Sequence, residues 1–288
     1  MSWKNKYFNH LAKLFRSSPS FKGKKKLARW LFAKSYLSKN NIMILGKHDI
    51  QYSMPNCIDS IGFELLVDGI YEKDTIEFMV NNIPKQGVLL DIGSNIGSIC
   101  LPVTKLRKDI TVLCIEASKN IYNHLYHNID LNRLRNMEAF HFALSDQNSE
   151  NVSFYSPTEK FGKGSLAPVF TTNAEYVDTK TLDSFLDELQ LTTVDFIKMD
   201  VEGFEYAVLK GAATLLTSDD APDVLFEFVD WAESQAISGN TGKAQELLMN
   251  YGYKLYRLKG NMVPQLIDLP IKDGAAMIFA TKKQINRD

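Results

Sequence analysis

The sequence predicts an α/β fold with a mainly parallel sheet, an antiparallel edge strand and helices on both faces. Between residues 88 and 228, short apolar runs alternate with segments that carry apolar residues at helical spacing, a pattern typical of such sheets. The first run ends in the turn Asp91–Gly97, which leads into an apolar helix-like segment. Two closing runs, 253–258 and 276–281, follow each other without a long helix between them. They are expected to pair antiparallel at the edge of the sheet.

Apolar runs bounded by turn residues predict the other strands. These are expected at 63–67, 88–91, 110–116, 140–144, 152–155, 194–200 and 224–228. Helical spacing predicts the helices between them, with Asp74 and Ser118 as caps and Pro102 as a point where the first helix shortens or kinks. The helices are expected at 74–83, 96–106, 118–129, 181–189, 204–216 and 244–249. Residues 156–175 are polar, contain two glycines and two prolines, and are expected to form a loop.

The composition indicates an ordinary globular protein with enough apolar material for a large core. The chain has 288 residues, of which 45% are apolar and 23% charged. No apolar run reaches membrane-spanning length, and the first residues lack the apolar stretch of a signal peptide. The cysteines number three and form no C-x-x-C pair, which argues against a disulfide framework or a zinc site. The cytoplasm is the expected compartment.

The charge is divided unevenly along the chain. The first 48 residues hold twelve lysines and arginines and no aspartate or glutamate, whereas the whole chain has a formal net charge of -1. Apolar and aromatic residues stand between these basic residues at near-helical spacing. We therefore expect residues 1–50 to form a basic amphipathic extension. Two interpretations stay open, a helical arm packed on the domain or a peripheral contact with the anionic inner membrane surface. Nucleic acid is disfavoured as a partner.

The turn Asp91-Ile-Gly-Ser-Asn-Ile-Gly97 is the main candidate for a binding site. Gly93 and Gly97 allow backbone angles that bring a ligand close to the main chain, and Asn95 tolerates left-handed angles. The pattern D-x-G-x-N-x-G is similar to the first motif of S-adenosylmethionine (SAM) methyltransferases, and the alternative is a purely structural turn. Glu116 ends the next strand, 25 residues after Asp91, where a carboxylate can bind both hydroxyls of a ribose.

Two further groups of residues follow later strands. Ala143 and Leu144 come where an adenine ring would lie, and Asp146 follows them as a cofactor contact or a turn residue. The second group is dense in charge and ends the strand at 194–200. It contains Lys198, Asp200, Glu202 and Glu205. A carboxylate at the end of a buried strand, beside the glycine turn, is expected to serve the site.

The ordered set of motifs resembles the FkbM family of SAM-dependent methyltransferases over about residues 60–260. The motifs that carry the resemblance are DIGSNIG at 91–97, Glu116, ALSD at 143–146, TLD at 181–183, DFIKMDVEGFE at 195–205 and LFE at 225–227. Ala117 departs from the proline common in the family, and Pro102 is unusual. The resemblance implies a Rossmann-like class I methyltransferase sheet, with residues 51–288 as the methyltransferase domain and 1–50 outside it.

The resemblance also implies an activity, the transfer of a methyl group from SAM to a hydroxyl of a sugar, glycolipid or related small molecule. Asp200 or Glu202 would act as the base, and Lys198 would orient that carboxylate or the acceptor. Asp200, Glu202 and Glu227 could hold a metal, but no histidine supports such a site and none is expected. Two alternatives remain, a nicotinamide-dependent oxidoreductase, whose G-x-G-x-x-G motif is lacking, and a non-catalytic membrane-associated component.

Overall fold

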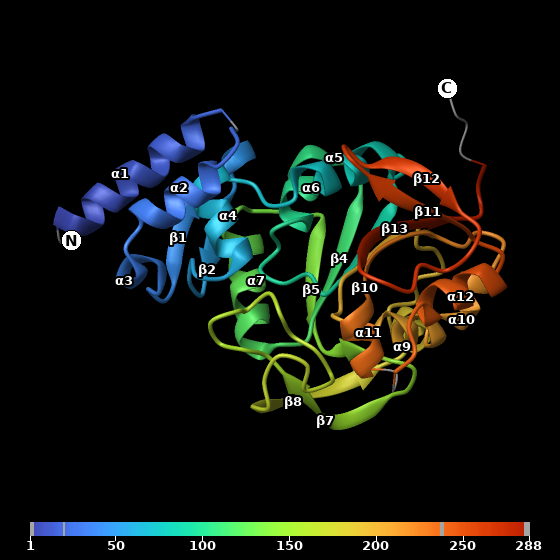
Figure 1. The fold of residues 1–288 in the computed structure, drawn as a ribbon. Coiled ribbons are helices and arrows are strands. Elements are labelled where there is room, and N and C mark those ends of the chain that lie inside the picture. The colour runs from blue at the N-terminus through green and yellow to red at the C-terminus, as the bar shows by residue number, and fades with distance from the viewer. Residues whose placement is uncertain (1–2, 20, 237–238, 285–288) are drawn as a thin grey trace.

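An eight-stranded sheet forms the centre of the computed structural model, which describes residues 3–19, 21–236 and 239–284 (Figure 1). In spatial order its strands are β12 (Val263–Ile267), β11 (Lys254–Lys259), β13 (Ala275–Thr281), β10 (Asp223–Val229), β9 (Phe196–Met199), β3 (Val88–Ile92), β4 (Thr111–Glu116) and β5 (Met137–His141). The strands from β10 to β5 are parallel, and β13, β11 and β12 pair antiparallel. The predicted α/β class, the mainly parallel sheet and its antiparallel edge are confirmed.

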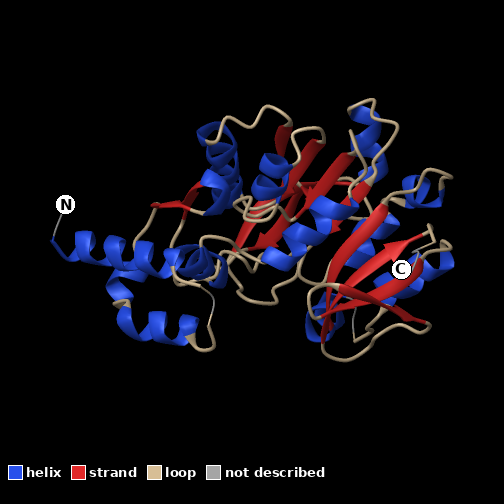
Figure 2. Cartoon of the chain, turned by 90° about the horizontal axis from the view of Figure 1, so that it is seen from above, coloured by secondary structure: helices blue, strands red, loops and turns tan. Residues whose placement is uncertain are grey.

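Helices cover both faces of the sheet (Figure 2). The helices that follow β2 along the chain are α4 (Ser60–Asp68), α5 (Lys73–Asn82), α6 (Cys100–Leu106), α7 (Lys119–Leu131), α8 (Leu182–Glu188), α9 (Glu205–Lys210), α10 (Ala213–Thr217), α11 (Asp230–Ala236) and α12 (Lys243–Asn250). Leu89 packs with α5, α6 and α7, whereas Leu90 packs with α8, α9, α10 and α12 on the other face. Successive strand residues point to opposite faces, so two apolar cores form from continuous apolar runs.

The order of the strands creates a crevice between β3 and β9. From β3 the chain runs to β4 and β5 on one side, and then crosses back to β9 and β10 on the other. Loops that leave neighbouring strands in opposite directions open a space beyond their carboxyl ends, where ligands bind in such sheets. Residues 91–97, which we call the glycine turn, and residues 200–205, which we call the acidic turn, both leave the sheet at this point.

A small second sheet lies beyond the carboxyl end of β5. It consists of β6 (Ala143–Leu144), β8 (Ala174–Lys180) and β7 (Ser149–Tyr155). Residues 156–173 connect β7 to β8, return toward the crevice and form most of the loop predicted at 156–175. The last two residues of that prediction, 174 and 175, belong to β8. The sequence analysis did not include this strand because its alternation of polar and apolar residues is weak.

The basic extension packs against the domain at one end of the molecule (Figure 1). It comprises α1 (Trp3–Ser17), α2 (Lys24–Leu31), α3 (Lys34–Leu37), β1 (Ile42–Leu45), a 3₁₀ turn η1 (Lys47–Asp49) and the antiparallel partner of β1, β2 (Gln51–Met54). Phe15 and Phe32 join the same apolar core as Phe63 of α4. The hairpin of β1 and β2 crosses the boundary expected at residue 50. No helix among the described residues combines the length and apolarity needed to cross a bilayer.

Several local predictions were wrong. Residues 63–67 form α4 rather than a strand, because Asp59 caps the helix by accepting from the Ile61 amide and Gly69 ends it with a φ of 73°. A short apolar run does not distinguish strand from helix, but these two flanking residues do. Ser118 makes no side-chain cap, and the expected helix 204–216 is two short helices. The helix predicted at 96–106 is α6, which starts at Cys100. Pro102 therefore lies in its first turn, where proline is tolerated.

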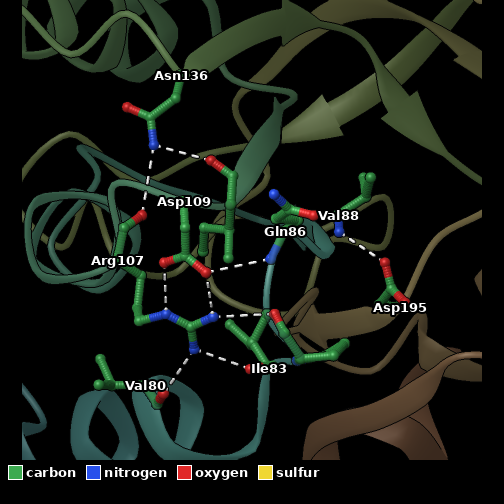
Figure 3. Close-up of polar contacts among 10 residues, drawn as sticks. Val80, Ile83, Gln86, Val88, Arg107, Asp109, Asn136 and Asp195 are labelled. Atoms are coloured by element: carbon green, nitrogen blue, oxygen red, sulfur yellow. Dashed lines mark hydrogen bonds and ion pairs between the residues drawn. The ribbon is translucent and has the colours of Figure 1, made fainter.

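A polar cluster around Arg107 fixes the opposite, amino-terminal end of the strands (Figure 3). The guanidinium donates to three main-chain carbonyls at the end of α5, those of Val80, Ile83 and Pro84. It also forms a two-point ion pair with Asp109. These contacts satisfy carbonyls that a helix end leaves without partners. The cluster therefore supports the scaffold from the side away from the crevice.

Candidate active site

A pocket opens at the carboxyl ends of β3, β4, β9 and β10 and encloses about 1010 Å³ of space that is partly continuous with solvent. Its walls include residues from the glycine turn, the end of β4, β6, the acidic turn after β9, the loop 156–173 and the segment before α5. The sequence-predicted residues that line it are Gly93, Asn95, Glu116, Ala143, Leu144, Lys198, Asp200 and Glu202. The sheet thus brings together residues that are more than 100 positions apart.

The glycine turn is held against the turn that follows β9. Gly93 has a φ of 76°, and a Cβ built on it would lie 2.0 Å from the main-chain oxygen of Asp200. Asn95 has a φ of 53°, as its tolerance of left-handed angles predicts. Its side-chain amide donates to the Phe161 carbonyl over 3.0 Å. Gly97 also has a positive φ but contacts Leu101 behind the turn, and it does not line the pocket.

Glu116 presents a buried carboxylate to the pocket. It is 7% exposed. One carboxylate oxygen accepts from the Asn95 amide over 2.9 Å and the other from the Ser118 amide over 2.8 Å. Burial raises the pKa of Glu116 to about 7, although both amide donors act to lower it. The carboxylate is therefore fixed in place and keeps acceptor positions for donors of a ligand.

Asp91 and Lys198 form a buried pair at the pocket floor, of which only Lys198 lines the pocket. Asp91 is 1% exposed and does not line the pocket, and neither of its carboxylate oxygens has a hydrogen-bond partner. The Lys198 ammonium lies 3.6 Å from Asp91 and 4.0 Å from Asp200. Burial alone would lower the pKa of Lys198, but Asp91 and Asp200 outweigh it and the pKa is raised. Lys198 therefore stays charged and links the ends of β3 and β9.

Another wall of the pocket consists of three carboxylates and one lysine, those of Asp200, Glu202, Glu227 and Lys163. Glu202 is 5% exposed, its Oε1 pairs with Lys163 of the loop 156–173, and its Oε2 has no hydrogen-bond partner. Burial, with the nearby Asp200 charge, raises the pKa values of Glu202 and Glu227 to about 7. A carboxylate with such a pKa can accept a proton near neutral pH.

Two acidic residues near the site are occupied elsewhere. Glu205 accepts from the amides of Val201 and Gly203 over 3.1 Å each, so it shapes the acidic turn. Asp146 does not line the pocket and pairs with Lys210 over 2.7 Å. The structure thus favours its role as a turn residue over that of a cofactor contact.

Among the described residues, one set of three potential metal ligands has all its ligand atoms within 4.8 Å of one another. The set consists of Asp91, Cys100 and Cys114. It is buried behind the glycine turn, and its carboxylate already faces Lys198. Asp200, Glu202 and Glu227, the set weighed in the sequence analysis, do not meet this spacing.

Sequence reasoning missed two functional candidates, Tyr71 and Lys163, which both line the pocket. Tyr71 precedes α5, and Lys163 stands between two glycines in a segment expected only to be a loop. No local pattern marks either residue. A clue to Lys163 is the surplus of carboxylates in the acidic turn, because buried carboxylates require a cation.

Residues 91–255 match the model of the methyltransferase FkbM domain. The chain belongs to the FkbM methyltransferase family. This membership confirms the family resemblance and identifies the protein as a methyltransferase. The matched segment begins at the glycine turn, contains Glu116 and the whole acidic turn, and ends in β11.

Three curated relatives match about half of this chain. They are the 2-O-methyltransferase NoeI of Sinorhizobium fredii (27% identical, 53% of this chain, 66% of the relative), Methyltransferase 1 of Beauveria bassiana (24%, 54%, 67%) and the hexuronic acid methyltransferase AglP of Haloferax volcanii (28%, 51%, 59%). The chain thus spans about two thirds or less of the length of these relatives.

Solved structures resemble the chain more distantly. A precorrin-6y C5,15-methyltransferase from Geobacter metallireducens is 13% identical, with a TM-score of 0.43 over 74% of this chain and 92% of that one. Trm5b from Pyrococcus abyssi is 11% identical, with a TM-score of 0.44 over 84% of this chain and 56% of that one. The fold of this chain is therefore assigned from its own strand order and not from these structures.

Proposed function

We propose that this methyltransferase transfers the methyl group of SAM to a hydroxyl of a sugar or a sugar-containing acceptor such as a glycolipid. The observation that carries the proposal is the single pocket in which the glycine turn, Glu116 and the acidic turn meet. The names of NoeI and AglP support an acceptor of the sugar class. The nicotinamide alternative has no such support.

The donor side of the pocket fits the parts of SAM. A carboxylate offers about four acceptor positions, and Glu116 uses two of them for main-chain amides. The remaining two match the two hydroxyls of a ribose. Ala143 and Leu144 supply an apolar wall for an adenine ring, and the main chain at Gly93 and Asn95 borders the space left for the methionine end. Asp91 supports this arrangement from beneath through Lys198.

The acidic turn supplies the residues for proton removal. SAM brings an electrophilic methyl group, and an alcohol attacks it well only when a base takes the hydroxyl proton. We assign this role to Glu202, because it lines the pocket together with Asp200 and its buried Oε2 has no hydrogen-bond partner. Asp200, held by Lys198, orients the same hydroxyl. Alignment of the acceptor oxygen, the methyl carbon and the SAM sulfur in the pocket supplies the rest of the rate acceleration.

The proposal is tested by transfer of an isotope-labelled methyl group from SAM to a panel of neutral and acidic glycans. We expect label on a sugar oxygen, located by mass spectrometry and NMR, and much less label with the Glu116→Ala variant at the same limiting SAM concentration. Label on nitrogen, or equal transfer by the variant, would contradict the assignment. A panel without any labelled product, together with no SAM binding in calorimetry, would refute the function as a whole.

A further inference from the structure

The basic extension exposes an outer face that the packing of the domain does not explain. On α1, Ala12 is buried and Arg16 donates to the Leu66 carbonyl of α4. Leu14 lies between them in sequence and is 55% exposed. Two residues along a helix correspond to a rotation of about 200°, so Leu14 points away from the domain.

The same arrangement recurs on α2. Lys25 pairs with Glu64, and Arg29 lies 4.2 Å above the Phe63 ring, so both residues face α4. Leu27, halfway between them, is 43% exposed and points the other way. Trp30, on the same outer side, is 80% exposed. Two adjacent helices therefore present large apolar side chains outward. Phe15 of α1 contacts Phe32, the residue that follows α2, with ring centroids 6.0 Å apart.

Lysines surround these apolar side chains. Lys13, Lys22 and Lys26 are exposed, and none of the three forms an ion pair with another residue that the structure describes. Their basic neighbours Lys24 and Lys25, in contrast, are paired with carboxylates of α4. The extension thus uses one set of cations to dock on the domain and leaves a second set on its outer face.

We propose that this outer face, which we define as Lys13, Leu14, Lys22, Lys26, Leu27 and Trp30, binds the surface of an anionic lipid bilayer. Apolar side chains interspersed with lysines match the boundary between acyl chains and anionic headgroups. A nucleic acid would engage the lysines, but its phosphates gain little from Leu14 and Leu27. The remaining chain is rich in acidic residues, so an anionic surface attracts this face and repels others.

The location of the face connects it to the pocket. The extension packs on α4, a helix of nine residues whose first two residues, Ser60 and Ile61, line the pocket. A helix of that length spans about 14 Å. α4 therefore connects the extension to the pocket wall, while the outer side chains of α1 and α2 point away from the domain. The membrane contact itself does not depend on which acceptor is methylated.

The test is flotation of the full-length protein with phosphatidylcholine vesicles that contain phosphatidylglycerol, and with phosphatidylcholine vesicles alone. We expect salt-sensitive flotation only with the anionic vesicles. The double variant Lys22→Glu/Lys26→Glu should bind at least about 30-fold more weakly, since each lysine near such a surface contributes about 1 kcal/mol and each glutamate adds repulsion. The matched control is Lys254→Glu/Lys259→Glu, which reverses two exposed lysines of β11 and should bind as the unchanged protein does.

Insertion of the apolar side chains has a separate readout. Brominated lipids should quench tryptophan fluorescence, and Trp30→Phe should remove most of that quenching, whereas Trp231→Phe should retain it. Unchanged melting curves would show that these exposed substitutions leave the fold intact. No flotation at low salt, equal weakening in the control, or charge-dependent binding to RNA without binding to vesicles would overturn the proposal.

Discussion

Replacement of Glu116 by alanine should weaken donor binding about 100-fold. In the proposed complex the carboxylate accepts from two ribose hydroxyls. Each hydrogen bond to a charged group contributes about 1.5–3 kcal/mol. Part of this loss is recovered, because water enters the space that the side chain leaves. A net loss of about 2.7 kcal/mol, at the low end for two bonds, corresponds to a factor of about 100 in the dissociation constant.

Calorimetric titration with S-adenosylhomocysteine measures this change without turnover. The variant also leaves the amides of Asn95 and Ser118 without their acceptor, so its melting temperature should be compared with that of the unchanged protein. Asp146→Ala is the matched control, because Asp146 is a carboxylate near the adenine side that pairs outward with Lys210. Its affinity should stay within about twofold. An affinity of Glu116→Ala within threefold of the unchanged protein would refute the ribose role.

Four further outcomes are expected. Burial raises the pKa of Glu116 to about 7, and the ionised form binds the ribose hydroxyls. The affinity for S-adenosylhomocysteine should therefore fall roughly tenfold from pH 8 to pH 6. This pH dependence should vanish in the Glu116→Ala variant. Glu202→Gln should retain that affinity and lower kcat at least about 100-fold in the methyl-transfer assay; an unchanged kcat would exclude it as the base. Arg107→Ala should lower the free energy of unfolding in urea by about 2–4 kcal/mol, because three partly buried carbonyls lose their hydrogen-bond donor, while the affinity for S-adenosylhomocysteine stays constant. Gly93→Ala should abolish donor binding, since its Cβ would lie 2.0 Å from the Asp200 oxygen, whereas Gly252→Ala, at a similar positive φ with nothing within 4 Å, should bind normally.

The sequence was sufficient to predict the sheet and most of the pocket, for a physical reason. Buried parallel strands require long apolar runs, and the residues that end such runs meet at one edge of the sheet. Gly93, Glu116 and Asp200 are all strand-end residues, so their convergence follows from the order of the elements. Asp91 differs from these residues, because it lies one residue before the end of β3, where it is buried and does not line the pocket.

Contacts between distant loops could not be predicted in this way. Lys163 reaches Glu202 from a segment without periodicity, and Tyr71 reaches the pocket from the start of α5. Their positions depend on how the loop 156–173 folds back, and that depends on tertiary contacts such as the bond from Asn95 to the Phe161 carbonyl. The strand predicted at 63–67 was wrong for a different reason, since the flanking residues Asp59 and Gly69, and not the apolar run itself, mark the segment as a helix.

The close approach of Gly93 to the Asp200 carbonyl has a consequence for how this enzyme can diversify. The two main-chain segments that border the proposed point of methyl transfer lie against each other without an intervening side chain, so neither can shift alone. The proposed acceptor walls near Ile61 and Lys163 come from separate segments, and these contact the two turns through side chains and single hydrogen bonds. Exchange of the loop 156–173 between family members should therefore alter which molecule is modified while the reactive alignment is inherited intact.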